Sequence, residues 1–541
     1  MKPWKPWPLS LYDSALGLSR RSQLKRPMAS LAAIIAGFWG MDPVLAQDQV
    51  PRRSANPQTY AITLTSALDG PIAADATLTL REAIALTNAD LTLADLSPAE
   101  QSQVKPQKNG QNSEIRLELP PGAAIQLQSL LPPLRQGGLT LNGNGATLVP
   151  ALATPLPWGL LVMADNITLQ NLQLQGFHSR DPDDYPFVGA VVVTTGQMLY
   201  DLGRFPDIVQ LTPPQNFVLE DSQLGANGFG VVLFEAQNPT LQRNQFRANW
   251  GSGLLTGKTA QGLQLADNLF WGNGDVAQAD AVRLEGEING TTIVGNTFCH
   301  NAGAGVFLFK PEGSIAVEQN LFARNGHRNP AAALYLMGSG HRVQNNRILD
   351  QNGPGIAVAG YPRSVGNTLQ DNLFAQIQGL SIDLVTRQAR DIQAFRVADG
   401  PNPRRESHNR RSDTGNGAVQ TPQFAGLEFF PFGDRVKISG RTDPDATVDL
   451  YRVLESGGYF GPLSEFVERT VADGEGNFEF SLVAWEAGDR LTAIATDPVY
   501  GTSEPAENAV IRDFAPLDAA ATIDRPLPLP DLPTLCQEGP P

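Results

Sequence analysis

Hydrophobic and polar positions between residues 171 and 378 recur in a short phrase. An Asn stands two positions before an aromatic or aliphatic residue, another Asn and a Gly usually follow, and a short apolar segment comes next. The anchors are Asn244, Asn268, Asn296, Asn320, Asn346 and Asn372. Ser222 and Asn171 begin weaker, earlier copies, and from Ser222 onward the anchors lie 22 to 28 residues apart. Self-similarity at such a period is typical of a solenoid.

The apolar segments alternate in twos, as strands do, and lack the 3.6-residue period of helical repeats. One position is aliphatic in nearly every coil: Val231, Leu254, Val282, Val306, Leu334, Ile356 and Leu380. Two residues on, a second aliphatic row reads Leu233, Leu284, Leu308, Leu336, Val358 and Ile382, with Thr256 as the exception. Both rows are expected to face inward. These short strands with Asn and Gly corners favour a right-handed parallel β-helix that rises about 4.8 Å per coil, with the anchor Asn side chains stacked in a structural ladder.

Residues 1–46 have the organisation of an export signal. A basic segment precedes an apolar run at 28–41, and Val44-Leu45-Ala46 supplies small residues before a cut ahead of Gln47. The apolar run is too short to span a bilayer, and no later segment reaches eighteen apolar residues. The sequence therefore predicts a secreted, cell-surface or periplasmic protein without a transmembrane segment after signal removal. A single uncleaved anchor is the alternative.

The chain after residue 46 carries 34 Lys and Arg against 53 Asp and Glu. This negative balance argues against nucleic acid or an anionic membrane as a partner.

A linker at 47–58 leads to residues 59–150, which are expected to form an N-terminal cap and the first coils. Thr79 is placed to cap a helix within 77–88, and Glu82, three residues on, completes a capping box. The apolar side of this helix would cover the open end of the solenoid, where exposed strand edges and core invite aggregation.

The phrase Leu78-Thr-Leu-Arg-Glu-Ala-Ile84, with Asn88 after it, resembles the Leu-Arg-Glu-Ala-Ile…Asn motif of the bacterial surface proteins called CSLREA-domain proteins. In those proteins a similar segment precedes a pectate-lyase-like parallel β-helix. The Cys of the motif's name is absent here, because Thr stands in its place. Segments near Ser381 and Asp413 resemble the exit segment of the same proteins. The resemblance implies a right-handed β-helix, whose body we place at 151–385.

After an Arg-, Pro- and Gly-rich connector at 386–421, the pattern changes. Residues 422–514 contain alternating segments separated by turn residues, at 435–440, 446–451, 466–471, 477–482 and 490–495. Their number and spacing predict a β-sandwich, and its turns look like those of bacterial Ig-like modules. The expected fold class is therefore all-β: a right-handed parallel β-helix solenoid with an N-terminal capping helix, plus a C-terminal Ig-like β-sandwich.

Two further features of the C-terminal part bear on chemistry. The carboxylates of Asp473 and Glu475 are candidates for a Ca²⁺ site, with a hairpin turn as the alternative, and no other cofactor is expected. The tail at 515–541 is Pro-rich and expected to be extended. Cys299 and Cys536 can pair in an oxidising compartment only if this tail folds back onto the β-helix.

Between the inward rows lies an outward row: Val232, Leu255, Arg283, Phe307, Tyr335, Ala357 and Ser381. One alternation further on come Phe234, Glu285, Phe309, Met337 and Asp383. The candidate ligand-binding residues on this face are Arg283, Glu285, Phe307, Phe309, Lys310 and Tyr335. Their spacing of about 5 Å suits aromatic stacking against a long molecule such as a glycan. The alternative is that the insertions, the C-terminal module or a partner chain cover this apolar patch.

Two inserted loops, 178–187 and 198–215, flank the strand expected at 189–195. Long loops on a solenoid usually form the walls of a groove. The catalytic candidates there are Asp183, Asp184, Arg204 and His178, because carboxylates beside a His and an Arg can transfer protons. A solvated loop is the alternative explanation, and the sequence lacks a dense Asp cluster on consecutive coils.

The expected function is that of an exported, non-catalytic β-helix protein that presents an extended outer face for glycan or cell-surface binding. The competing hypothesis is a polysaccharide lyase, hydrolase or epimerase with its groove at the two loops around strand 189–195.

Overall fold

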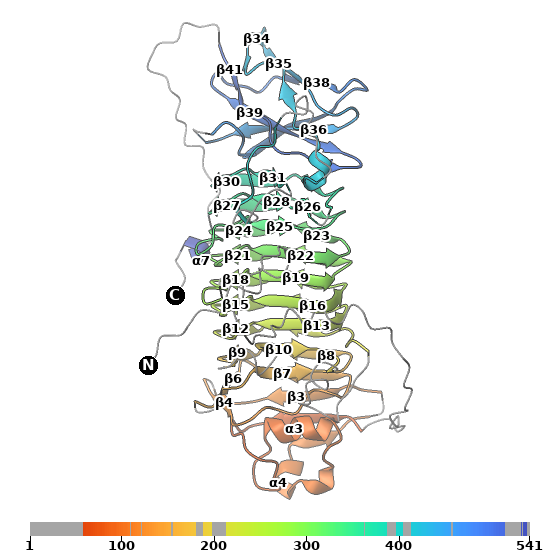
Figure 1. Ribbon diagram of the computed structural model, residues 1–541. Coiled ribbons are helices and arrows are strands. Elements are labelled where there is room, and N and C mark those ends of the chain that lie inside the picture. The colour runs from red at the N-terminus through yellow and green to blue at the C-terminus, as the bar shows by residue number, and fades with distance from the viewer. Residues whose placement is uncertain are drawn as a thin grey trace, which may run out of the picture.

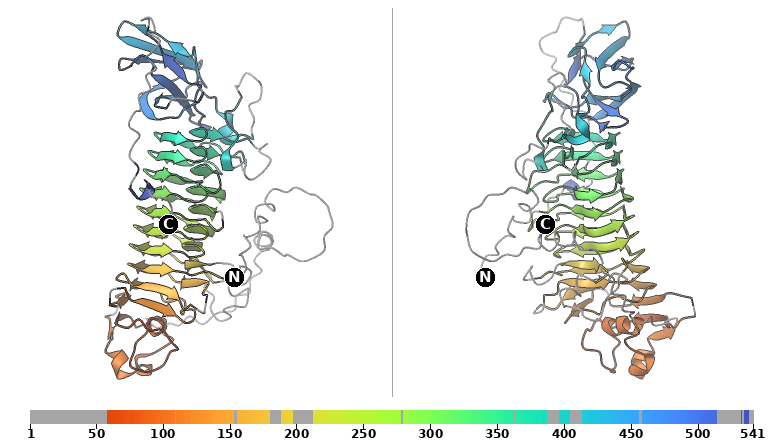
Figure 2. Two further views of the ribbon diagram at one scale, coloured as in Figure 1. Left: turned by 90° about the vertical axis from the view of Figure 1, so that its left-hand side faces the viewer. Right: turned by 45° about the vertical axis from the view of Figure 1, so that its right-hand side comes forward.

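The computed structural model describes residues 58–108, 110–120, 122–152, 155–179, 188–196, 212–277, 279–361, 363–386, 396–403, 413–455, 458–513, 532 and 534–537. The chain forms a right-handed parallel β-helix of about 9 turns, with a second β unit at its C-terminal end (Figure 1). The stack is long and narrow, and the second unit continues it at one end (Figure 2). Within the described residues, no helix is long and apolar enough to cross a membrane.

Three sheets form the faces of the β-helix, and each coil from β5 onward contributes one strand to each sheet. The first sheet has 12 strands, in the order β2 (Val104–Pro106), β1 (Tyr60–Leu64), β3 (Ser113–Leu117), β5 (Leu139–Asn142), β8 (Ile167–Gln170), β11 (Val218–Glu220), β14 (Thr240–Gln242), β17 (Gln264–Ala266), β20 (Thr291–Val294), β23 (Ile315–Glu318), β26 (Arg342–Gln344) and β29 (Thr368–Gln370). All its neighbours are parallel except β1 and β2.

The second sheet has 10 strands, in the order β4 (Ala124–Leu127), β6 (Thr147–Pro150), β9 (Gln173–Gln175), β12 (Gln223–Gly225), β15 (Gln245–Arg247), β18 (Leu269–Trp271), β21 (Thr297–Cys299), β24 (Leu321–Ala323), β27 (Arg347–Gln351) and β30 (Leu373–Ile377). The third sheet has 9 strands, in the order β7 (Trp158–Val162), β10 (Gly189–Val193), β13 (Val231–Gln237), β16 (Leu254–Gln261), β19 (Val282–Glu287), β22 (Val306–Glu312), β25 (Leu334–Leu336), β28 (Ile356–Val358) and β31 (Ile382–Leu384).

The predicted Asn ladder is confirmed at the corner between the first and second sheets. The Oδ1 atom of Asn296 accepts hydrogen bonds from the backbone N–H and the side-chain Nδ2 of Asn268, at 2.9 and 3.0 Å. Asn296 makes the same two bonds to Asn320, at 2.8 and 3.0 Å. Its Nδ2 also donates to the backbone oxygen of Leu265, at 2.8 Å. Because these amides are buried, each ladder bond satisfies a polar group that water cannot reach.

Each ladder residue follows a residue in the left-handed backbone region. These preceding residues have φ between +51° and +68°, and they are Asp221, Arg243, Asp267, Gly295, Gln319, Asn345 and Asp371. That conformation costs about 1–2 kcal/mol for a residue with a side chain. Repeated hydrogen bonds from the following Asn therefore offset a strain that recurs at every coil.

A second ladder, which the sequence analysis did not identify as one, lies at the corner between the second and third sheets. It consists of Asn227, Asn249, Asn273, Asn301 and Asn325. Asn249, for example, donates from its backbone and side chain to Oδ1 of Asn273, at 3.2 and 2.8 Å. Two buried amide ladders thus run side by side along the stack.

The inward aliphatic rows are confirmed, with two corrections of register. Ile356 pairs with Ile382, so that Ile382 belongs to the first row in the last coil and Leu380 does not. In the early coil, the backbone of Leu172 donates to the Ser222 hydroxyl, so Leu172 occupies the ladder position that was assigned to Asn171. Asn171 instead supplies the left-handed residue, with φ of 52°.

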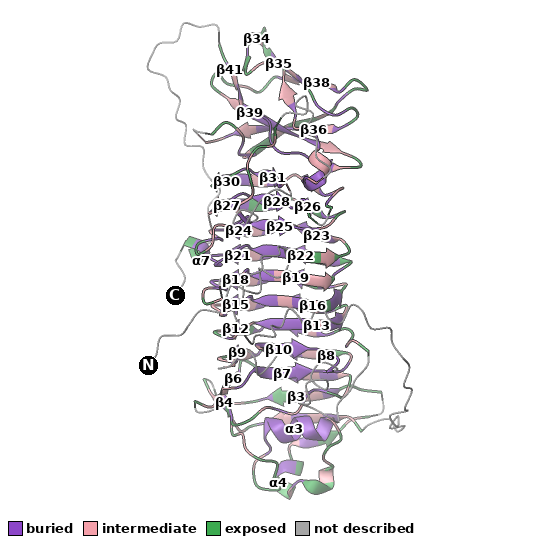
Figure 3. Cartoon of the chain, viewed as in Figure 1, coloured by how far each residue is buried: buried purple, intermediate pink, exposed green. Residues whose placement is uncertain are grey.

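The core adds a column of aromatic rings to the aliphatic rows. Phe246, Phe270, Phe298 and Phe322 stack with ring centroids 4.5, 5.0 and 4.7 Å apart. All four side chains are fully buried. Figure 3 shows this burial along the strands of the stack.

At the N-terminal end, helix α3 (Leu80–Thr87) begins with the predicted capping box. The Thr79 hydroxyl accepts from the backbone N–H of Glu82, whose carboxylate accepts from the backbone N–H of Thr79. Helices η2 (Leu93–Asp95) and α4 (Pro98–Gln101) follow. Leu80 and Ile84 belong to the same apolar core as the first strands.

The second unit has a core of its own. Its strands are β32 (Gln423–Phe424), β33 (Glu428–Phe429), β34 (Pro431–Phe432), β35 (Arg435–Arg441), β36 (Thr447–Val453), β37 (Glu465–Val471), β38 (Asn477–Leu482), β39 (Arg490–Asp497), β40 (Gly501–Thr502) and β41 (Ala509–Ile511), after helix η4 (Gly415–Ala418). They form two sheets, β32–β35–β34 with β38, and β33–β41–β39–β36–β37 with β40. The five predicted strands correspond to β35 to β39.

The C-terminal tail returns to the second sheet of the β-helix. Helix α7 (Thr534–Gln537) lies beside β21 and β24 (Figure 1), and Cys536 forms a disulfide with Cys299. The backbone oxygen of Cys536 also lies 2.9 Å from Nε2 of His300 and 3.2 Å from the Arg324 guanidinium. The fold-back that the two cysteines required is therefore present.

The ladder predicts a large effect of one amide. Replacing Asn296 by Ala leaves buried donors and acceptors on both neighbouring coils without partners, at about 1–3 kcal/mol for each lost group. We expect Asn296→Ala to lower the free energy of unfolding by at least about 2 kcal/mol in urea titrations. The exposed Gln264→Ala serves as the control, and equal effects of the two substitutions would contradict the ladder.

The disulfide makes a second prediction. Closing a loop of 237 residues restricts the unfolded chain, so Cys536→Ser is expected to lower the free energy of unfolding by about 2–5 kcal/mol. Thiol labelling of the untreated protein should detect no free cysteine, and labelling of the variant should detect Cys299 after unfolding. Reactive thiols in the untreated, unfolded protein would disprove the pairing.

Candidate functional site

The outer face of the third sheet carries the predicted outward row. Arg283 pairs in register with Phe307, and Phe307 pairs with Tyr335. Ala357 then pairs with Asp383, so Asp383 rather than Ser381 completes the row. The same two-residue shift that moved Ile382 explains this correction.

Two of the predicted ligand-binding residues, Phe307 and Tyr335, are buried. Phe307 and Tyr335 stack with centroids 4.8 Å apart and an interplanar angle of 11°. Only 6% of Phe307 and 1% of Tyr335 are exposed. Residues 396–403, which we call the cover, contribute Ala398 to the apolar cluster around these rings. In this conformation part of the connector therefore covers both rings, and their role in ligand binding stays a prediction.

Arg396 fixes the beginning of the cover on the sheet. Its guanidinium makes two hydrogen bonds to the buried carboxylate of Asp280, at 3.1 and 3.2 Å, and lies 5.1 Å from the centre of the Phe307 ring. Its backbone oxygen accepts from the N–H of Ala332, at 2.8 Å. A two-point ion pair of this kind is directional and positions the cover over the rings.

The remaining predicted residues form a strip beside the cover. The guanidinium of Arg283 lies 4.9 Å from the centre of the Phe309 ring, and the ammonium of Lys310 lies 5.3 Å from it. Nε of Arg283 also donates to Glu285, at 2.5 Å. Arg283, Glu285 and Phe309 are partly exposed and Lys310 is exposed. The structure therefore brings these four residues together, and we call them the strip.

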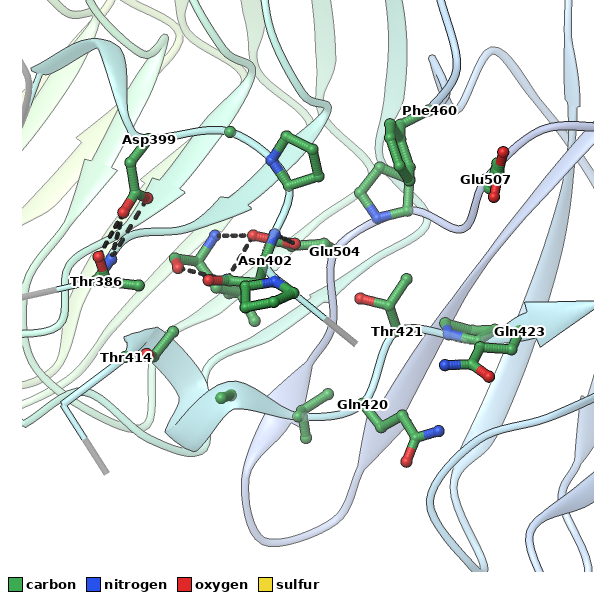
Figure 4. Close-up of a pocket in the computed structure, with 18 of the residues that line it drawn as sticks. Thr386, Asp399, Asn402, Thr414, Gln420, Thr421, Gln423, Phe460, Glu504 and Glu507 are labelled. Carbon is green, nitrogen blue, oxygen red and sulfur yellow. Dashed lines mark hydrogen bonds between the residues drawn. The ribbon is translucent and has the colours of Figure 1, made fainter. Parts of the chain in front are cut away.

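A pocket lies where the cover meets the second unit (Figure 4). It encloses about 400 Å³. Its polar lining includes Asp399, Asn402, Glu504 and Glu507, and its apolar lining includes Phe460. The lining contains no Lys, Arg or His within the described part of the chain, so the pocket favours neutral or cationic groups.

Three carboxyl groups hold the cover at this end. Glu504 accepts from the backbone N–H groups of Leu384 and Asn402, at 3.0 and 2.7 Å, and from Nδ2 of Asn402, at 2.7 Å. Asp383 accepts from the N–H of Gly400, at 2.9 Å. Asp399 accepts from the N–H and hydroxyl of Thr386 (Figure 4). The cover, the last coil and the second unit therefore meet through carboxyl groups.

Asp383 and Glu504 are buried, and the exposed Asp399 lies close enough for its charge to act on both. Burial, and then the charge of Asp399, raise the pKa of Asp383 to about 8. Burial, and then the charge of Asp383, raise the pKa of Glu504 well above its ordinary value. A neutral carboxyl group can donate a proton in catalysis, but Glu504 is fully engaged in holding Asn402 and Leu384. The arrangement fits attachment of the cover better than acid–base chemistry.

The other sequence candidates are less informative. His178 stacks on Trp250, with centroids 4.3 Å apart, whereas Asp183, Asp184 and Arg204 lie outside the described residues. Asp473 accepts from the backbone N–H groups of Glu475 and Asn477, at 2.9 and 2.8 Å. The hydrogen bond from the Asn477 side chain, and then the one from the Asn477 backbone, lower the pKa of Asp473. This geometry is that of a hairpin turn closed by its own Asp side chain.

The sequence analysis missed Asp280, Arg396, Asp399 and Glu504. Asp383 was on the outward rows, but its partners are separated from it by up to 121 residues of chain, and no period connects them. An isolated Asp before the apolar strand at Val282 was the only sequence signal for Asp280.

Comparisons with known proteins agree with the fold. A family model described as a right handed beta helix region matches residues 207–326 and 278–389. No curated protein matches the sequence significantly.

Solved structures with a similar backbone include a mutant of the periplasmic alginate epimerase AlgG, at 16% identity and a TM-score of 0.36 over 53% of this chain and 64% of that chain. A mannuronan C-5 epimerase module of Azotobacter vinelandii matches at 14% identity and a TM-score of 0.30, over 49% and 90%. The Dettilon tailspike protein matches at 12% identity and a TM-score of 0.34, over 74% and 81%. The chain thus spans less than two thirds of the first of these proteins.

The ion pair of the cover can be tested directly. Arg396→Ala leaves the buried Asp280 carboxylate without its main cation, so we expect a loss of about 3–5 kcal/mol in unfolding free energy. Replacing both partners, as in Arg396→Met with Asp280→Asn, which keeps an acceptor for the backbone N–H of Ala304, should restore much of that loss. Denaturant titrations of the three proteins measure the difference. A single variant as stable as the wild type would show that the pair does not hold the cover.

Proposed function

We propose that the protein is exported and binds a carbohydrate chain, without catalysis, through the strip of Arg283, Glu285, Phe309 and Lys310. The observation that carries the proposal is the position of Phe309 between two cationic groups on a rigid parallel sheet. Phe307 and Tyr335 support this strip from the adjoining buried positions.

The chemistry of the strip suits a sugar. An aromatic ring offers apolar area at a low cost in conformational entropy, and a few polar groups around it fix the orientation of a ligand. Arg283 and Lys310 can donate hydrogen bonds to hydroxyl or carboxylate oxygens, and Glu285 can accept them. The sheet holds Phe309 and Glu285 in neighbouring coils, about 4.8 Å apart. Because these positions are fixed before a ligand arrives, less conformational entropy is lost on binding.

Export is supported by the disulfide between Cys299 and Cys536, because such bonds persist in oxidising compartments. Within this proposal, residues 1–46 are the export signal and helix α3 covers the N-terminal end of the core, as in CSLREA-type surface proteins. The second unit acts as an Ig-like sandwich that serves as a spacer or a second binding module. Its two sheets around a separate core support this part of the proposal.

A second candidate function is a polysaccharide lyase, hydrolase or epimerase at the loops around β10. The stacking of His178 on Trp250 favours it, because this contact fixes the position of the imidazole ring. Under this hypothesis, His178 would transfer protons together with Asp183, Asp184 and Arg204.

The strip predicts a selective loss of binding. Phe309→Ala removes the ring that faces the ligand and is expected to weaken glycan binding at least about tenfold, which isothermal titration of the mature protein against a glycan panel measures. Phe432→Ala is the matched control, because this ring is 89% exposed on the second unit.

Equal affinities of both variants and the wild type would exclude the strip as the binding site. Release of unsaturated products from uronate polymers in the same panel would instead establish the lyase.

A further inference from the structure

The cover lies over the aromatic pair next to the strip, so its movement would change how much aromatic surface the strip offers. One end is held by the Arg396–Asp280 ion pair. The other end is held by carboxyl groups from three parts of the fold: Asp383 of β31, Asp399 of the cover and Glu504 of the second unit. The two ends therefore differ in chemistry, because only the second depends on like-charged groups.

The closed arrangement leaves two buried polar atoms without partners in the described part of the chain. They are the hydroxyl of Tyr335 and Oδ1 of Asp383. Tyr335 is 1% exposed and Asp383 is 2% exposed. A buried polar atom without a hydrogen bond costs about 1–3 kcal/mol, so both groups gain hydration if the cover moves away.

We propose that the cover is a pH-dependent clasp, which adds Phe307 and Tyr335 to the glycan-binding strip when its carboxyl groups lose their protons. This proposal rests on the proposed function of the strip. An opened cover would join Tyr335 and Phe307 to Phe309, and the binding face would then extend over two neighbouring coils.

The direction of the pH effect follows from burial. The closed state raises the pKa of Asp383 from 3.8 to about 8, so closure is fully favoured below about pH 4 and weakens as pH rises toward 8. For one proton, each pH unit in this window shifts the ratio of open to closed molecules about tenfold. The raised pKa of Glu504 acts in the same direction.

The other groups around the clasp set its limits. On the sheet side, Asp280 binds Arg396, and this pair opposes opening, whereas Arg283, 3.9 Å from Asp280, belongs to the sheet and stays beside it. Burial raises the pKa of Tyr335, so its hydroxyl stays neutral through this window. On the side of the second unit, Glu507 lines the pocket and adds negative charge. The ratio of open to closed molecules therefore depends on pH through the carboxyl groups at the second end of the cover.

Hydrogen exchange of the full-length mature protein tests the clasp without any glycan. After correction for intrinsic rates, we expect the protection of peptides covering 396–403 to fall at least about tenfold between pH 5 and pH 9. Peptides of β16 and β19 should keep their protection. The isosteric Asp383→Asn should reduce the pH dependence, because it carries no charge at either pH and leaves Glu504 as the remaining buried carboxyl group.

Glu504→Gln is the second variant, and its pH dependence should also decrease. Asp434→Asn is the control, because this carboxylate is 89% exposed and its loss should change nothing. Constant protection of the wild type from pH 5 to 9 would overturn the clasp, as would an undiminished pH dependence in Asp383→Asn.

Glycan titrations at both pH values separate the two proposals. Affinity that rises with pH in the wild type, and rises less in Asp383→Asn, supports the clasp and the proposed function. Binding that depends on Phe309 but not on pH, together with constant protection, overturns the clasp and leaves the proposed function standing. Opening at high pH with no binding to any glycan overturns the proposed function and leaves the clasp.

Discussion

The fold depends on vertical hydrogen bonding between equivalent residues of successive coils. Every coil turns through left-handed residues, including Arg243 and Gln319, which gain nothing locally from that conformation. The Asn that follows offsets the free-energy cost of this conformation, because its amide forms hydrogen bonds to the coils before and after it. With two such ladders, a shift of one residue would strand a column of buried amides, so register is fixed along the stack.

Register at the corners also fixes the outer faces. On the first sheet the outward positions, such as Thr168 and Gln170, are polar and partly exposed. On the second sheet, Trp271 and Cys299 form an apolar area that the tail helix covers through the disulfide. The outer face of the third sheet carries the apolar cluster around Phe307 and Tyr335, and Arg396 brings the cover onto it. The same repeat thus produces three outer faces of different polarity. The two apolar areas named above are covered by segments from outside the repeat, namely the cover and the tail helix.

Sequence reasoning reached the features that repeat and missed those that do not. The sequence predicted the Asn244-to-Asn372 ladder and the inward rows because the same pattern of residues recurs in successive coils. The sequence analysis placed the last coil two residues too early, because Gly379-Leu380 has the same local pattern as Gly355-Ile356. In the structure, Ile356 pairs with Ile382 instead. The outward aromatic residues were found, but not their burial. Their cover depends on Arg396 and Asp280, 116 residues apart, and no pattern in the sequence relates the two.

The most direct test of the in-register stack uses paired cysteines on the bare first sheet. Gln264 and Thr292 are register partners in adjacent coils, whereas Ala316 lies one coil further on. A short bis-thiol reagent should bridge Gln264→Cys with Thr292→Cys, about 5 Å apart, much faster than Gln264→Cys with Ala316→Cys, about 10 Å apart. Equal rates for the two pairs, or faster bridging of the distant pair, would contradict the stacking on which this account rests.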